Sequence, residues 1–312
     1  MLRLLISIFI SSIMYGDYLG GYPGAGQRYA TNAREMSLGN ALSSEYNEGF
    51  NAFSNPALIT QSKGLEFGSS YFFMTLDRFV QTFSVTRKLP PSAGASLSVF
   101  RSGVQDIPGK NFSNESTGTF ESSESYVMFS FGISMIESIA LGFNIKAIFN
   151  NIEDYSADGL SGDLGLLYNF SDRLAFSWVA SNIFGEYYWD SLTATSGKFE
   201  EELPMINSVG LKFDFSDDVK IFSKLDYMAP EEVDFYRFQA GAEIDRADYV
   251  LRFGLIQNQG LDSEDPFNFK ILLGAGTYLK VFKNHKIKLD YCIDLGKEEE
   301  GISNLFSLSF IR

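Results

Sequence analysis

The sequence is poor in the residue types on which many enzymes depend, since its 312 residues include one histidine, His285, and one cysteine, Cys292. A single cysteine excludes an intrachain disulfide. The lone histidine falls in a predicted turn and on no strand face where it could activate a serine, which disfavours a serine-histidine hydrolase. The sequence therefore indicates a protein that is not an enzyme.

Motifs for cofactors and metals are also lacking. The glycine-rich stretch Gly20–Gly26 lacks the Gly-Lys-Ser/Thr ending of a phosphate-binding loop and follows no predicted strand. Three acidic groups lack the spacing of a calcium-binding loop, and we expect them to form solvated rims. These groups are Glu200–Glu202, Asp262–Asp265 and Glu298–Glu300. We therefore expect neither a metal nor a cofactor.

Positive charge is scarce, with 25 Lys and Arg against 39 Asp and Glu and a net charge of -14, which excludes a nucleic-acid partner. No apolar run approaches the 18 residues of a membrane-spanning helix. The longest, Leu4–Met14 behind Arg3, would rise about 16 Å as a helix, against roughly 30 Å for a bilayer. We interpret residues 1–16 as a cleaved signal peptide of an exported protein, the alternative being a buried core segment.

Aromatic residues, by contrast, are abundant: they make up 15% of the chain, with 30 Phe and 16 Tyr. From Leu65 onward, apolar and polar residues alternate with a period of two, which predicts β-strands. The stretch Phe213–Tyr227, FDFSDDVKIFSKLDY, contains two such runs joined by a polar turn. Fourteen strands are predicted, at about 65–75, 79–89, 92–103, 123–135, 137–151, 158–171, 173–184, 205–215, 218–227, 236–245, 248–258, 269–281, 285–295 and 303–312.

The connections between these strands sort into two kinds. Those after even-numbered strands are short, as in FSDR and FSDD, whereas several after odd-numbered strands are long and polar, such as residues 103–122 and 185–205. Tight turns at one end, long loops at the other and an even strand count are typical of a bacterial outer-membrane β-barrel. The predicted fold is therefore an all-β, fourteen-stranded antiparallel transmembrane barrel over residues 65–312. A soluble β-sandwich is the alternative, and it would not sort its loops in this way.

The alternation also predicts which face meets lipid. A lysine facing the bilayer midplane costs about 2–4 kcal/mol, so Lys212, Lys224 and Asp226 are expected to face a hydrated lumen. The intervening Phe213 and Leu225 are then expected to face lipid.

Residues 17–64 precede the barrel and form a separate periplasmic or plug segment. Ala33-Arg34, Met36, Gly39, Ala41 and the run Asn55-Pro56-Ala57-Leu58 resemble the opening of the PorV/PorQ family of outer-membrane proteins. The stretches Gly159–Phe176 and Tyr187–Pro204 are similar to that family's central strands and following loop. The Asn-Pro-Ala run is shared with the wider barrels of the fatty-acid-transporter (FadL) type.

This resemblance implies a FadL-like barrel with a short N-terminal segment at its periplasmic mouth, located in the outer membrane. It also implies a component of type IX secretion that binds secreted cargo proteins and other secretion components. The alternative is a FadL-like outer-membrane channel for hydrophobic or small solutes. The outer-membrane lipid is the other expected partner.

The long loop between residues 185 and 203 carries the residues that we expect to bind a protein partner, because aromatic side chains anchor interfaces. They are Tyr187, Tyr188, Trp189 and Phe199. Alternatively, Tyr187 to Trp189 belong to the aromatic girdle at the membrane boundary.

Overall fold

A computed structural model describes residues 22–191, 199–229, 234–246, 249–257, 269–282, 285–296 and 301–312. The proposed signal peptide lies outside the described residues, as do the acidic groups at 262–265 and 298–300. In the described part of the chain, no helix is long and apolar enough to cross a membrane.

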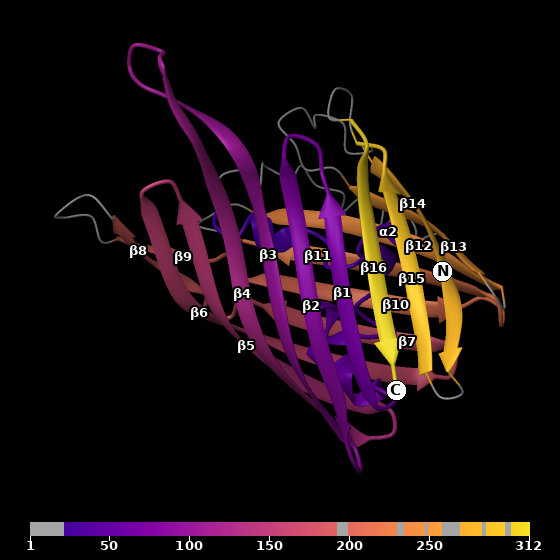
Figure 1. The fold of residues 1–312 in the computed structure, drawn as a ribbon. Helices are drawn as coiled ribbons and strands as arrows, with labels where there is room; N and C mark the ends of the chain where they lie inside the picture. Colours follow the sequence, from indigo (N-terminus) through magenta and orange to yellow (C-terminus); the bar gives the residue numbers. More distant parts are fainter. Residues whose placement is uncertain are drawn as a thin grey trace.

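The described residues contain sixteen β-strands that form one antiparallel sheet, closed by the pairing of β5 with β6 (Figure 1). The strands are β1 (Leu65–Phe73), β2 (Arg78–Leu89), β3 (Ala93–Lys110), β4 (Ser116–Ile136), β5 (Ile139–Ile152), β6 (Tyr155–Ser171), β7 (Leu174–Ser181), β8 (Glu186–Ser191), β9 (Phe199–Glu202), β10 (Ile206–Asp214), β11 (Val219–Met228), β12 (Phe235–Arg246), β13 (Tyr249–Gln257), β14 (Phe269–Phe282), β15 (His285–Asp294) and β16 (Ser303–Ile311). The last strand, β16, pairs with the first, β1, which Figure 1 shows side by side.

The sixteen strands occupy fourteen positions around a closed barrel, as predicted. We call each position a stave, whether one strand or two successive strands occupy it. Both β7 and β8 pair with β6, one after the other along its length, so together they make one interrupted stave. The adjoining stave consists of β10, which pairs with β7, and β9, which pairs with β8. The barrel therefore has one broken pair of neighbouring staves.

Two predicted loops are wrong in part, because they continue the strands. Most of residues 103–122 belongs to β3 and β4, whose hairpin rises beyond its neighbours in Figure 1. Within residues 185–205, Glu186–Ser191 and Phe199–Glu202 form β8 and β9. Where a strand extends past the membrane, both of its faces carry polar side chains. The alternation of apolar and polar residues that predicts a strand is therefore absent there.

The outer surface carries a belt of exposed apolar side chains on nearly every stave, which is the surface of a membrane-spanning barrel. Members of this belt include Phe83, Leu97, Phe129, Ile145, Leu211, Ile221, Phe253, Leu289 and Phe306. The predicted lipid-facing residues Phe213 and Leu225 are exposed in the same way, whereas Asp226 is buried inside. The predicted register of these strands is therefore confirmed.

The N-terminal segment lies inside the barrel and fills much of its lumen. It contains the short elements η1 (Gly26–Arg28), α2 (Ala33–Ser37), α3 (Asn51–Ser54) and η2 (Pro56–Gln61). Asn32 caps α2 by accepting a hydrogen bond from the Glu35 backbone N–H, and Asn55 caps η2 in the same way through Ala57. Helix α2 packs against β13–β16 and η2 against β2–β6, so the two contact opposite parts of the wall. The predicted periplasmic or plug segment, residues 17–64, thus has its described part, from residue 22, inside the lumen, and we call that part the plug.

Candidate functional site

Buried ion pairs hold the plug to the wall. The guanidinium of Arg34, on α2, forms a two-pronged contact with Glu243 of β12, with N–O distances of 2.7 and 2.8 Å. Glu243 also accepts a hydrogen bond from Arg252 at 2.7 Å, and Arg252 donates to Asp290 at the same distance. All four side chains are almost completely buried. A carboxylate between two guanidinium groups makes a strong, geometrically specific anchor.

Two glutamates of the plug make further anchors. Glu48 accepts a hydrogen bond from Lys288 at 2.9 Å and lies 3.7 Å from Arg34. Burial alone would raise the pKa of Glu48, but the charges of Lys288 and Arg34 outweigh it and lower that pKa to about 2. Glu45 lies 2.6 Å from Lys220 and 3.1 Å from Lys212. The plug is therefore held as an ionised partner of the wall.

A set of lumen-facing glycines lets the plug backbone approach the wall directly. A methyl group added to any of these glycines would lie closer to atoms of the plug than the ordinary van der Waals contact distance. At Gly142 it would overlap the backbone of Pro56 and Ala57, and at Gly241 it would come within 2.6 Å of the Leu38 carbonyl oxygen. The glycines that face the plug in this way are Gly68, Gly94, Gly132, Gly142, Gly165, Gly210, Gly241, Gly254 and Gly274. They lie on nine of the fourteen staves, so the plug fits closely against most of the circumference.

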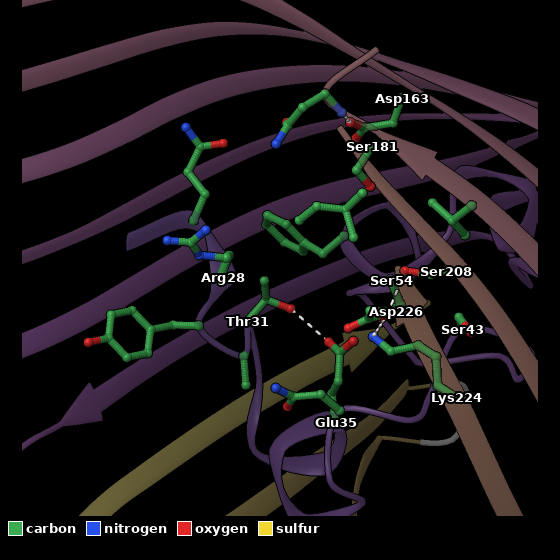
Figure 2. A pocket seen from close by; sticks show the side chains of 18 of the residues that line it. Arg28, Thr31, Glu35, Ser43, Ser54, Asp163, Ser181, Ser208, Lys224 and Asp226 are labelled. Atoms are coloured by element: carbon green, nitrogen blue, oxygen red, sulfur yellow. Dashed lines mark hydrogen bonds and ion pairs between the residues drawn. The ribbon is translucent and has the colours of Figure 1, made fainter. Parts of the chain in front are cut away.

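A cavity of about 130 Å³ remains between the plug and the wall (Figure 2). Figure 2 shows the labelled plug residues Arg28, Thr31, Glu35, Ser43 and Ser54 facing Asp163, Ser181, Ser208, Lys224 and Asp226 of the wall. Apolar side chains from α3, β4 and β7 complete the lining; they include Phe53, Tyr126, Met128 and Val179. The cavity thus has both apolar and charged walls.

The charged groups of the cavity are held in place by one another. Asp226 accepts hydrogen bonds from Ser208 at Oδ1 (2.7 Å) and from Arg237 at Oδ2 (2.9 Å), and its Oδ1 also lies 3.6 Å from Lys224 Nζ. Farther along the wall, Lys146 pairs with Asp163 at 2.7 Å.

Glu35 belongs to the plug and faces the same space as Lys224 (Figure 2). It accepts hydrogen bonds from Thr31 and Asn32. Burial raises the pKa of Glu35, against the opposing charge of Lys224 and these hydrogen bonds.

The wall is weakest beside this cavity, where the two broken staves meet. The β7–β10 ladder ends at the Ser181–Ile206 pair, and the β8–β9 ladder resumes at Glu186–Glu202. Between these points, two hydrogen bonds cross the seam in the described residues: Leu203 N–H donates to Gly185 O at 2.7 Å, and Asn182 Nδ2 donates to Pro204 O at 3.4 Å. Few backbone hydrogen bonds therefore hold the seam closed.

Asn182 stands at the centre of the seam in a left-handed conformation, with φ of 58°. Its side-chain oxygen accepts hydrogen bonds from Ser161 at 3.1 Å and Lys146 at 3.4 Å, and its backbone N–H donates to Asp163. Asparagine tolerates this backbone conformation better than most residues. Asn182 therefore links the polar lining of the lumen to the neighbouring stave.

Two further cavities adjoin the inner one. A vestibule of about 320 Å³ lies between the start of the plug and the ends of β2–β5, and Tyr29 lines both this vestibule and the inner cavity. A pocket of about 910 Å³ lies at the seam, lined by Ile183, Phe184 and Met205 among others, and Asn182 lines both it and the inner cavity. The vestibule and the seam pocket also share Tyr22 and Pro23, so each of the three spaces adjoins the other two.

The four aromatic residues predicted to bind a partner are divided between the two faces of β8 and β9. Tyr187 is completely buried; its hydroxyl donates to Glu124 at 2.8 Å and accepts from Gln27 at 2.9 Å. Trp189 is also buried, and it donates to Glu201 and stacks on Phe199 with centroids 5.7 Å apart. Tyr188 and Phe199 are exposed. The structure thus places only two of the four at an accessible surface.

Sequence reasoning missed the anchors of the plug and the seam. Arg34 and Glu243 are separated by 209 positions, and no local pattern connects them. The recurrent glycines on the polar face of the strands were the available signal, since a glycine inside a strand often marks a close backbone approach. In the described ranges, no group of three or more His, Cys, Asp or Glu has the arrangement of a metal site.

Comparison with known proteins places the fold. No known protein family and no curated protein matches this sequence. Among solved structures, the chain is similar to the CymD monoaromatic hydrocarbon channel, with a TM-score of 0.64, 13% identity and 90% of this chain covering 97% of that one. The Pseudomonas putida toluene transporter TodX matches with a TM-score of 0.61 and 13% identity, over 90% of this chain and 96% of that one. A Pseudomonas aeruginosa FadL homologue matches with a TM-score of 0.61 and 11% identity, over 95% of this chain and 99% of that one. The chain therefore has the fold of FadL-type outer-membrane barrels; similarity to the PorV/PorQ family finds no counterpart among these matches.

Proposed function

We propose that this protein is a non-enzymatic outer-membrane channel for hydrophobic or small solutes, which leave the lumen sideways through the seam between the broken staves. The observation that carries the proposal is that Asn182 lines both the inner cavity and the pocket at the seam. A solute in the cavity is separated from the outer surface of the wall by this side chain and few backbone hydrogen bonds.

The plug supports a sideways route, because it obstructs the straight one. Its atoms lie directly on glycines of nine staves, and its glutamates and Arg34 are paired with charges of the wall. A solute moving along the barrel axis would have to break these buried ion pairs, whereas opening the seam breaks few hydrogen bonds. The solved structures with the same fold are described as hydrocarbon channels and a toluene transporter, which agrees with such a role.

The seam route predicts that a disulfide across the wall stops transport. Ser181→Cys with Ile206→Cys pairs two residues that are cross-strand partners beside the seam, and Glu186→Cys with Glu202→Cys does the same on its other side. With Cys292→Ser as background, we expect the doubly locked barrel to lose most of its uptake of radiolabelled toluene into proteoliposomes, and to regain it on reduction.

The matched control is a disulfide at Val99→Cys with Val127→Cys, which joins two partner residues of the intact β3–β4 ladder. It should leave uptake unchanged in both redox states. Equal uptake by the oxidised and reduced forms of the seam-locked barrel would contradict a route through the seam.

Binding of a protein partner, such as secreted cargo in type IX secretion, remains a second candidate function. It is favoured by the hairpin of β8 and β9, which presents exposed Tyr188 beside Glu200 and Glu202 on one face and exposed Phe199 on the other. Exposed aromatic residues with a charged surround are typical of binding surfaces.

A double substitution of the exposed pair, Tyr188→Ala with Phe199→Ala, tests this candidate. We expect an assembled barrel that no longer co-purifies with its partner in mild detergent, because both side chains are exposed. Tyr155→Ala, which removes an exposed aromatic ring from β6, is the control. Unaltered partner recovery from the double variant would exclude these two residues as the binding surface.

A further inference from the structure

We propose that the vestibule binds the solute before it crosses the barrel, and that it selects an uncharged ring compound that carries a hydroxyl group, of the class of the phenols. This inference rests on the proposed channel function and specifies the solute that the channel takes up. The vestibule, at about 320 Å³, lies within the roughly 300–1,000 Å³ of small-molecule sites. It also exceeds the cavity of about 150 Å³ that binds benzene, so it has room for a substituted ring.

A row of polar side chains crosses the wall of the vestibule. Ser102 of β3 is the cross-strand partner of Glu124 of β4, and Glu124 is the partner of Asn150 of β5. All three line the vestibule, as does Ser122, two residues before Glu124 on the same face of β4. The Cβ atoms of directly opposed residues lie about 4.5–5.5 Å apart, so one small molecule can contact several members of this row.

This row has hydrogen-bonding capacity that the protein does not use. Ser102 is only 2% exposed and lines the vestibule, yet its hydroxyl has no hydrogen-bond partner in the described residues. The side chains of Ser122 and Asn150 likewise form no hydrogen bond within the described part of the chain. Since buried polar groups are nearly always hydrogen-bonded, an unpaired hydroxyl at the wall of a vestibule indicates a partner that enters from outside.

The charges of the vestibule favour an uncharged ligand. The charged side chains among its described lining residues are Arg78 and Glu124, one of each sign. Arg78 donates two hydrogen bonds to Thr75, at 3.0 and 3.3 Å. Glu124 accepts one from the Gly26 N–H at 2.7 Å and one from Tyr187 at 2.8 Å. Because Glu124 lies in the middle of the polar row, it repels a carboxylate there but can accept a further hydrogen bond from a hydroxyl.

A ring with a hydroxyl group matches both parts of the lining. The hydroxyl can donate to Glu124 and accept from Ser102 or Asn150. The ring can lie against the apolar part of the lining, to which Tyr22 and Tyr29 contribute aromatic rings. A hydrocarbon of the same size would displace water from the polar row without replacing its hydrogen bonds, which lowers affinity.

The adjoining seam pocket disfavours two alternative solutes, an organic anion and a sugar. Tyr22 and Pro23 line both spaces, so a solute passes from one to the other beside them. Among the described lining residues of the seam pocket, Glu186 and Glu200–Glu202 are acidic and none is a lysine or an arginine, so an anion would be repelled. A sugar would leave hydroxyls unpaired against the apolar Ile183–Phe184.

Equilibrium dialysis of the purified protein in detergent, with protein-free micelles as the blank, tests the proposal. The probes are phenol, toluene and benzoate, which share one ring and carry a hydroxyl, a methyl or a carboxylate group. We expect phenol to bind at least tenfold more tightly than either of the others. Ser102→Ala should weaken phenol binding about three- to tenfold and leave toluene binding unchanged, because one hydrogen bond is lost.

Ser130→Ala is the matched control. Ser130 is also a fully buried serine of the wall without a hydrogen-bond partner in the described residues, but it does not line the vestibule. This variant should bind phenol as the unsubstituted protein does. A further variant, Glu124→Gln, keeps the shape of the side chain and removes its charge, so it should bind benzoate severalfold more tightly than the unsubstituted protein.

The outcomes separate this inference from the proposed function. Phenol binding no tighter than toluene binding would overturn the hydroxyl-selective site, and so would equal phenol binding by assembled Ser102→Ala and Ser130→Ala barrels. In either case, toluene uptake that the seam disulfides abolish would still support the channel. Phenol binding as expected, together with phenol uptake that the seam disulfides leave unchanged, would support the vestibule site and overturn the seam route.

Discussion

Replacing Gly142 with leucine is expected to expel the plug from a barrel that still assembles. The added side chain would overlap the backbone of Pro56 and Ala57, which cannot move aside as a flexible side chain could. Overpacking of a close contact costs about 1–3 kcal/mol when neighbours can relax, and a backbone-to-backbone approach relaxes less. The barrel ladders on both sides of β5 remain available. We therefore expect a severalfold rise in the ion conductance of the barrel in planar bilayers.

Proteolysis of the same variant offers a second measurement. An expelled plug should be cut between residues 22 and 64 under conditions in which the unsubstituted protein is protected. Ala147→Leu is the control, since it enlarges a side chain on the same strand but on the opposite, lipid-facing side. If Gly142→Leu stayed protected and conducted as the unsubstituted barrel does, the plug would not rest on this glycine.

The number of staves and their two faces were predictable, because a bilayer imposes a simple rule on each residue. A side chain between Leu65 and Ile311 faces either lipid or the lumen, and the alternation of Leu211, Lys212 and Phe213 records that choice. Beyond the membrane the rule no longer applies. The outer parts of β3 and β4 and the hairpin of β8 and β9 consequently had the composition of loops although they pair as strands.

The candidate site was less predictable, because it depends on contacts between distant parts of the chain. The predicted lumen-facing Lys212, Lys224 and Asp226 do face the interior, but nothing local to them indicated Glu45 or Arg237 as partners. Aromatic content indicated Tyr187 and Trp189 as exposed anchors, whereas strand β8 turns both into the lumen. The alternation of side chains tells which residues face the lumen only in a segment that has already been recognised as a strand.

Substituting Glu243 with glutamine should be the most damaging single change to the seating of the plug. Glu243 lies 2.7 Å from Arg34, nearer than Glu48 at 3.7 Å, and it also pairs with Arg252 at 2.7 Å. Glutamine keeps the shape but removes the charge, which leaves two buried guanidinium groups without this carboxylate. Removing one member of a buried ion pair costs about 3–5 kcal/mol. We expect protease sensitivity of the plug, measured against a barrel that retains its heat-modifiable migration.

The control breaks an exposed ion pair of the same type. Arg246 and Asp218 also lie 2.7 Å apart, but both side chains are about half exposed, at 57% and 48%. Asp218→Asn should cost about 1 kcal/mol or less, because water and salt screen exposed charges. A double variant, Arg34→Met with Glu243→Met, should regain part of the loss, since apolar groups replace a buried pair at small cost while Arg252 keeps Asp290. If Glu243→Gln and Asp218→Asn proved equally mild, the plug would be held by its shape against the glycines, and the buried charges would contribute little to its position.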